Sequence, residues 1–206
     1  MKPLHSCRRR SACPTRRGER GMTMIESLVA IVVLCFGMLG VVGLQAAALQ
    51  SNKEARYQAS ATRLARELAE MMRGNKDIAI LTSSADNPYL VDFTGTLPSK
   101  GTDCFAGACP TTKEVAAFQI WDWLTRVNAE LPGARVSVCI DSKPYDSGGL
   151  PQWNCTASGG TTVVKIGWTQ TTTDHAATGS SGVGSGGLAR AVRPGVVLPL
   201  VAGSST

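Results

Sequence analysis

The amino-acid sequence predicts an α+β protein, in which a long N-terminal helix packs on a small head that contains an antiparallel sheet. Residues 27–49 form an uncharged apolar run, and apolar residues at helical spacing continue beyond it as far as residue 73. Alternating apolar and polar residues, which are typical of strands, appear only later, in residues 135–140 and 161–172. We therefore expect a short sheet to cover the apolar face of the second half of the long helix.

The first 21 of the 206 residues carry the whole net charge of the chain, which is +6. This segment has one acidic residue, Glu19, and seven basic ones: Lys2, Arg8, Arg9, Arg10, Arg16, Arg17 and Arg20. The charges of residues 22–206 sum to zero. The excess of basic residues therefore belongs to a short leader rather than to a folded surface, so we expect no nucleic-acid partner.

The apolar run has 23 residues, and roughly 20 are needed to cross a bilayer as a helix. Because the basic leader precedes it, the N-terminus is expected to stay in the cytoplasm while the rest of the chain crosses the membrane. Three kinds of export segment fit this arrangement: a secretory signal cleaved near Ala46-Ala47-Ala48, a twin-arginine signal, or a leader removed ahead of the run. In the third case the run remains as a permanent membrane helix.

The sequence Gly21-Met22-Thr23-Met24-Ile25-Glu26 resembles the processing site of type IV prepilins. In that family a basic leader ends in Gly, cleavage follows the Gly, and the fifth residue of the mature chain is Glu. The family usually has Phe at the first mature position, where this chain has Met22. The resemblance implies cleavage by prepilin peptidase between Gly21 and Met22, N-methylation of Met22, and an inner-membrane precursor with a periplasmic head that later enters a pilus.

Glu26 places a carboxylate just ahead of the apolar run, where a charge is costly and is a functional hypothesis by default. Its position one turn from the helix start explains why it is tolerated, because it can reach the interface and the helix dipole favours a negative charge there. The pilin resemblance implies more: Glu26 of one subunit would neutralise the α-amino group of Met22 in a neighbour and so dock subunits into the filament.

Two helices are predicted, and the first of them contains the membrane run. The first helix is expected over residues 22–73, and its second half has one apolar face formed by Tyr57, Ala61, Leu64, Ala65, Leu68 and Met72. Residues 75–110 are expected to be irregular, apart from a short strand at residues 89–93. Thr111 and Glu114 fit a capping box that starts the second helix, whose apolar side is expected to contain Val115, Phe118, Trp121, Leu124 and Val127 and which Pro132-Gly133 ends.

Strands are predicted at residues 135–140 and, with Val164, Ile166 and Trp168 on one face, at residues 161–172. A third, weaker strand is expected near residues 189–197. The Gly/Ser-rich segment 176–187 predicts a mobile loop. The predicted domains are therefore a leader at residues 1–21, a helix at residues 22–73 with a membrane segment at 27–49, and a periplasmic head at residues 74–206.

Four of the seven cysteines lie in the head, and an even number in a translocated chain favours disulfides. Three pairings are open. We favour Cys104–Cys109, which would close a tight turn, and Cys139–Cys155, which would join the ends of a loop between two strands. A zinc site made of all four cysteines is the alternative, but Cys139 and Cys155 lack the short spacing of such sites. We expect no metal and no other cofactor.

No catalytic motif is present, so we expect no enzymatic activity and no catalytic residue; a membrane-anchored periplasmic enzyme remains the least favoured alternative.

Residues 121–139 and 163–168, and the absence of proline between Gly21 and Asn87, resemble the PilV type of minor pilin. This resemblance implies that the protein primes pilus assembly with other minor pilins, the major pilin and the inner-membrane assembly machinery. The main alternative is a minor pseudopilin of type II secretion, which shares the leader, the Glu and the fold.

Overall fold

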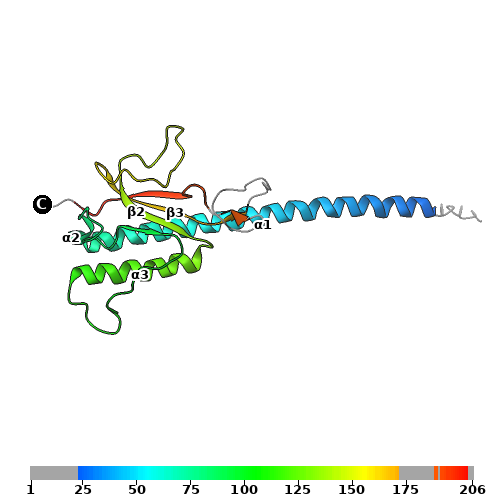
Figure 1. Cartoon of the computed structure of the whole chain (residues 1–206). Helices are drawn as coiled ribbons and strands as arrows, with labels where there is room; N and C mark the ends of the chain where they lie inside the picture. Colours follow the sequence, from blue (N-terminus) through cyan, green and yellow to red (C-terminus); the bar gives the residue numbers. More distant parts are fainter. Residues whose placement is uncertain (1–22, 172–187, 190, 204–206) are drawn as a thin grey trace, which may run out of the picture. The chain divides into compact units, whose positions relative to one another are not determined.

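The computed structural model describes residues 23–171, 188–189 and 191–203. Figure 1 shows the elements, which are α1 (Met24–Gly74), α2 (Lys76–Ala79), β1 (Val91–Phe93), α3 (Thr112–Glu130), β2 (Arg135–Asp141), β3 (Thr161–Gly167), β4 (Gln170–Thr171), β5 (Leu188–Ala189) and β6 (Val196–Leu200). The chain forms two compact units, Met1–Ala48 and Leu49–Thr206, which are described separately below. The predicted loop at 176–187 lies outside the described residues. The long helix and the antiparallel sheet confirm the predicted α+β fold class.

The second unit is built on the amphipathic part of α1. Ala61, Leu64, Ala65, Leu68 and Met72 have no exposed surface, and Tyr57 packs against them at the edge of the core. These positions recur every three or four residues, so they share one face of the helix. The buried face of α1 is therefore the one that the sequence predicts.

α3 begins where the capping box places it. Thr111 has extended backbone angles, and its side-chain oxygen accepts a hydrogen bond of 3.2 Å from the backbone N–H of Glu114. The helix ends before Pro132-Gly133, as predicted. Gly133 has φ +60°, and a Cβ there would lie 2.0 Å from the hydroxyl of Thr169, so this turn requires glycine.

The buried face of α3 differs from the prediction. Ile120 and Trp123 are buried in the core, whereas Val115 and Trp121 are only partly buried. The predicted positions advance in steps of three residues, and each such step stops about 60° short of a full helical turn. Over four steps the predicted stripe therefore turns around the helix, so that Val115 and Trp121 lie off the core whereas Leu124 and Val127 are buried in it.

Four strands form an antiparallel sheet in the order β1-β2-β3-β6. The strand predicted at 135–140 is confirmed as β2. The strand predicted at 161–172 is confirmed only as far as Gly167, where β3 ends, and Gln170–Thr171 form β4 in a separate two-stranded sheet. The third prediction is wrong in its position, because β6 covers residues Val196–Leu200 rather than 189–197. Pro199 lies in β6, and proline is tolerated in a sheet at an edge strand, where its missing N–H is not needed.

Both edges of this sheet resist pairing with a further strand. β1 has only three residues and exposes the charged Asp92, while β6 contains Pro199. Short edge strands, charged side chains and proline are devices that prevent edge-to-edge association. The head therefore offers no extended strand edge, among the described residues, through which another chain could extend the sheet.

Candidate assembly site

The apolar part of α1 has no packing partner among the described residues of its own unit. An 18-residue window of this helix has a mean hydropathy of 2.7, and none of it is buried. By length and composition it is the one described helix that could cross a membrane. Its exposed side chains include Leu28, Val29, Ile31, Val33, Leu34, Phe36, Leu39 and Leu44. An exposed apolar surface of this extent marks a site of interaction with a membrane or with another protein.

Glu26 lies in the first turn of α1 and is exposed. The backbone N–H groups of Glu26 and Ser27 both donate to the carbonyl of Thr23, at 3.0 and 3.3 Å, which fixes the start of the helix two residues into the expected mature chain. The partial positive charge of a helix N-terminus stabilises a carboxylate at this position. Gly21 and Met22, the expected cleavage and methylation sites, lie outside the described residues.

Gly37, Gly40 and Gly43 lie in the apolar part of α1, which is helical throughout. A Cβ at any of the three would have no heavy atom within 4 Å, so their backbone is exposed on the helix surface. Small residues at membrane-embedded positions let a second helix approach closely. This part of α1 can therefore receive a neighbouring helix without rearrangement of its own chain.

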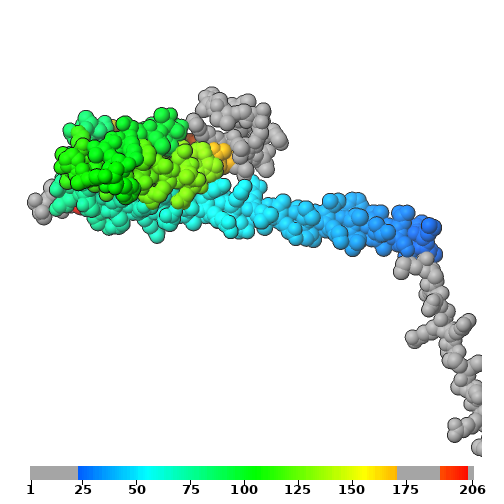
Figure 2. All heavy atoms as spheres, turned by 90° about the horizontal axis from the view of Figure 1, so that it is seen from below, coloured from blue at the N-terminus to red at the C-terminus, as the bar shows by residue number. Residues whose placement is uncertain are grey.

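In the second unit, α3 holds α1 in place by polar contacts as well as by packing, and Figure 2 shows the two helices side by side. The indole N–H of Trp123 donates a 2.9 Å hydrogen bond to the carbonyl of Leu64 and is buried. One terminal nitrogen of Arg63 of α1 donates to both carboxylate oxygens of Glu130 of α3, at 2.7 and 2.6 Å. Arg126 of α3 bonds Glu67. These contacts fix the orientation of α1 relative to the rest of the head.

A further contact joins α1 to the end of β3. Trp168, which is 2% exposed, donates through its indole N–H to both carboxylate oxygens of Glu54, at 3.1 and 3.3 Å. Gln170 donates to the same carboxylate at 3.3 Å. Trp168 was predicted on the inner face of the strand; it is buried there, but it lies just beyond the last residue of β3.

The structure joins Cys104 to Cys109 across a loop that exposes Phe105, whose side chain is 84% accessible. The ring of Phe105 packs edge-on against Phe118 with 4.9 Å between centroids. Asp103 accepts a bond of 2.6 Å from Lys100 and one of 3.0 Å from the N–H of Phe105, and these bonds hold the pKa of Asp103 below its usual range. The loop thus presents a phenylalanine on a rigid support, which the sequence analysis did not identify.

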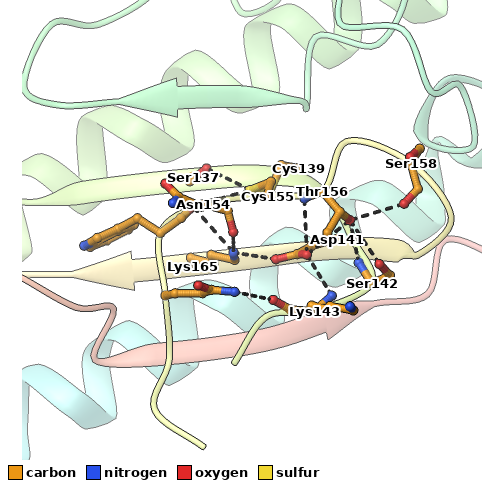
Figure 3. Close-up of a disulfide and its surroundings, with 12 residues drawn as sticks. Ser137, Cys139, Asp141, Ser142, Lys143, Asn154, Cys155, Thr156, Ser158 and Lys165 are labelled. Carbon is orange, nitrogen blue, oxygen red and sulfur yellow. Dashed lines mark hydrogen bonds and ion pairs between the residues drawn. A yellow bond between two sulfur atoms is a disulfide. The ribbon is translucent and has the colours of Figure 1, made fainter. Parts of the chain in front are cut away.

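The structure also joins Cys139 of β2 to Cys155, and a buried ion pair lies beside this disulfide (Figure 3). Lys165 of β3 lies 2.6 Å from Asp141, and neither side chain has exposed surface. The ammonium group also donates to the carbonyl of Asn154 at 2.8 Å and to that of Trp153 at 3.5 Å. All three donors of the lysine are therefore satisfied by groups that the disulfide-closed loop brings over the sheet.

Asp141 is equally well bonded. Its other oxygen accepts from the backbone N–H of Lys143 at 2.9 Å and from the N–H and hydroxyl of Thr156 at 3.3 Å each (Figure 3). Burial alone would raise the pKa of Asp141, but the hydrogen bonds and charge of Lys165 together with these donors outweigh it and lower that pKa. A charged pair that is bonded in this way is a structural support for the loop.

The disulfide-closed loop is also fastened at its far side. Arg193 lies 2.7 Å from Asp146 and donates to the carbonyl of Pro151 at 3.1 Å, while the indole N–H of Trp153 donates to the carbonyl of Ala191 at 3.2 Å. Backbone N–H groups, above all that of Leu150, and the Arg193 guanidinium lower the pKa of Asp146. These contacts join the loop to the segment before β6.

Neither a metal centre nor a catalytic group emerges from the described residues. Cys139, Asp141 and Cys155 have ligand atoms within 4.8 Å of one another, but both sulfurs are bonded in the disulfide and provide no thiolate. A groove of about 480 Å³ beside α2 is lined by residues 79–82, 140, 157–162 and 200–203, none of which is ionisable. The groove therefore offers no acid, base or charged nucleophile.

Two family models match the chain, and together they cover residues 16–121 without a gap. Residues 16–42 match the prokaryotic N-terminal methylation motif, and residues 43–121 match the family described as Type IV pilin Tt1218. No curated protein and no solved structure shows significant similarity to the chain. The first match contains Gly21, Met22 and Glu26, and the second contains the head-facing part of α1 and the first half of α3. Residues 43–121 are therefore similar to a family of type IV pilins, and residues 16–42 carry the N-terminal methylation motif.

Proposed function

We propose that this protein is a minor pilin of the type IV pilus, of the PilV type. After prepilin peptidase cuts between Gly21 and Met22, the mature chain waits in the inner membrane with its head in the periplasm. It then joins other minor pilins in a complex at the pilus tip that primes assembly of the major pilin. Surface pili, and with them twitching motility and cell adhesion, depend on this step.

The observation that carries the proposal is the exposed apolar part of α1 with Glu26 in its first turn. The methylation motif implies processing by prepilin peptidase and entry into a pilus. A carboxylate at this place in lipid is costly unless it is paired, and the new α-amino group of a neighbouring Met22 is a suitable partner. Pairing would lower the cost of moving the helix from lipid into the filament, which gives Glu26 its role in docking.

The head supports a specialised subunit rather than a bulk fibre subunit. Two loops are closed by disulfides, and one of them exposes Phe105. Residues 121–139 and 163–168, which resemble the PilV type, form part of α3 with β2 and the end of β3 in this head. Both edges of the sheet are protected, so assembly is left to α1 and to the loops.

A deletion strain distinguishes this proposal from a role as a minor pseudopilin of type II secretion. The proposal predicts that deletion removes surface pili and twitching while secreted enzymes still reach the medium, and that the wild-type gene restores both. The matched control is complementation with Gly21→Ala, which keeps the mature sequence but blocks leader removal and should not restore pili. Loss of enzyme secretion with normal piliation would contradict the proposal and favour the pseudopilin.

A further inference from the structure

Three basic side chains on α1 have no partner among the described residues. Lys53, Arg56 and Arg66 are exposed and make no hydrogen bond or ion pair within the part of the chain that the structure describes. The other arginines of this helix are all paired: Arg63 with Glu130 and Arg73 with Glu70. Figure 2 shows a strip of α1 (cyan) that α3 leaves uncovered. Exposed cations without a partner among the described residues are available to an anionic partner.

Glu54 lies between two of these cations in the sequence but does not neutralise them. Its carboxylate accepts hydrogen bonds from Trp168 and Gln170 on the head, and it forms no ion pair with Lys53 or Arg56. Lys53 and Arg56 are three residues apart, which makes them neighbours on one face of a helix. The side chains of the pair are exposed, so they form a local positive site beside an acidic residue that is already occupied.

The place of the pair in the chain indicates its partner. Lys53 and Arg56 follow the last residue of the apolar run, Leu49, by four and seven residues, or about 6 and 10 Å along a helix. Headgroups extend about 5–7 Å beyond each side of the hydrocarbon core, and long basic side chains can reach back toward it. Arg66 lies about 25 Å beyond Leu49, which is out of reach of the headgroups.

We propose that Lys53 and Arg56 bind the phosphate groups of anionic lipids in the leaflet on the head side of the membrane. This inference rests on the proposed membrane insertion of α1 but not on a role in the pilus tip. The guanidinium and the ammonium group bond phosphate oxygens, and together they hold the mature subunit at a fixed depth before assembly.

Removal of the leader leaves Lys53 and Arg56 as the basic residues nearest the N-terminus of the chain. Residues 22–52 contain no Lys or Arg, so Lys53 and Arg56 are the first basic side chains of the mature chain. Before cleavage, the seven basic leader residues attach the precursor to the anionic cytoplasmic leaflet. After cleavage, the basic contact with lipid lies on the head side only. The mature subunit is then free of the cytoplasmic tether that would oppose its movement toward the filament.

The test is native mass spectrometry of the full mature chain in a nonionic detergent, titrated with phosphatidylglycerol and, separately, with phosphatidylcholine. We expect tighter binding of phosphatidylglycerol, and the double variant Lys53→Gln/Arg56→Gln should weaken it by about 25-fold, at about five-fold per cation. Binding of phosphatidylcholine should not change. Arg66→Gln is the matched control, since it removes another exposed cation of the same helix that has no partner among the described residues, and it should leave both titrations unchanged.

Three results would overturn the inference. Equal weakening by Arg66→Gln would mean that any cation on the helix attracts the lipid. Equal binding of the two lipids by the wild-type chain would mean that no site selective for anionic lipids exists, because phosphatidylcholine carries the same phosphate but no net charge. A wild-type dimer that dissociates in the double variant, with lipid binding unchanged, would assign the two cations to a contact between subunits. Pilus phenotypes do not enter this test, so its failure is separate from a failure of the proposed function.

Discussion

Lys165 has no exposed surface although its sequence position alternates with the apolar face of β3. A lysine on the outer face of a two-layer head is expected in solvent. Here the loop closed by Cys139–Cys155 crosses that face and supplies Asp141 and two carbonyl groups as partners. The pair therefore depends on the loop, and the loop in turn is held by the pair.

Lys165→Met should destabilise the head by about 3–5 kcal/mol, because Asp141 would remain buried without its countercharge. Thermal unfolding of the full chain in detergent measures this change. The double variant Asp141→Leu/Lys165→Met should recover most of the loss, since a buried ion pair can be replaced by apolar groups of similar volume. If the single variant melts at the wild-type temperature, the pair does not support the fold.

Stability of the head should fall in acid because the pKa of Asp141 is lowered in the folded state. A carboxyl with a lowered folded pKa contributes its full stabilisation above its unfolded pKa, about 3.9, and loses it as the pH falls toward the folded value. Melting temperatures measured from pH 6 to pH 2 should therefore drop below about pH 4. Asp141→Asn should melt lower at neutral pH and show a smaller further drop; an identical acid slope in both proteins would contradict this assignment.

Glu26→Ala should leave the protein in the membrane but reduce its incorporation into pili, because the variant cannot neutralise a neighbour's α-amino group. Immunoblots of membrane and sheared pilus fractions measure the two pools separately. Glu26→Gln is the matched control for size and should behave like the alanine variant, since it also lacks the charge. Incorporation of either variant at the wild-type level would exclude charge neutralisation as the role of Glu26.

At the scale of elements, periodicity predicted α1 well and α3 less well. The buried face of α1 follows residues spaced by three and four, and all five fully buried residues were predicted. In α3 apolar residues occur on more than one side, because Phe118 and Phe105 form a small aromatic cluster away from the main core. Trp121 belongs to that cluster, with the ammonium group of Lys100 lying 4.8 Å from its ring. Sequence alone could not assign each aromatic residue to one cluster or the other.

Trp123→Phe should destabilise the contact between α3 and α1 by about 1 kcal/mol through the lost hydrogen bond to Leu64, with a further loss from the smaller ring. Thermal unfolding of the full chain checks this. Trp121→Phe is the control in the same helix, because Trp121 is partly exposed and belongs to the small aromatic cluster with Phe118. If Trp121→Phe lowered the stability more than Trp123→Phe, Trp121 rather than Trp123 would make the main contact between α3 and α1, which would contradict this assignment.

At the scale of the whole molecule, the features that could be predicted are those that depend only on residues close together in the sequence. The processing motif, the apolar run, the capping box at Thr111 and the strands around Val138 and Val164 all depend on a few neighbouring residues. The features that could not be predicted are contacts between segments far apart in the sequence. They are the ion pairs of Lys165 with Asp141 and of Arg193 with Asp146, and the hydrogen bond from Trp168 to Glu54. β6 was misplaced because Pro199 opposes a strand locally, although an edge position accepts it.

The most direct measurement is mass spectrometry of the N-terminal peptide of the protein, taken from membranes of cells with and without prepilin peptidase. The account predicts a mature chain that begins with N-methylated Met22 in the presence of the peptidase and a full leader in its absence. Gly21→Ala should keep its leader in both strains. A terminus near Ala48, or an unprocessed chain in cells that contain the peptidase, would contradict the assignment of Gly21, Met22 and Glu26 and with it the proposed route into the pilus.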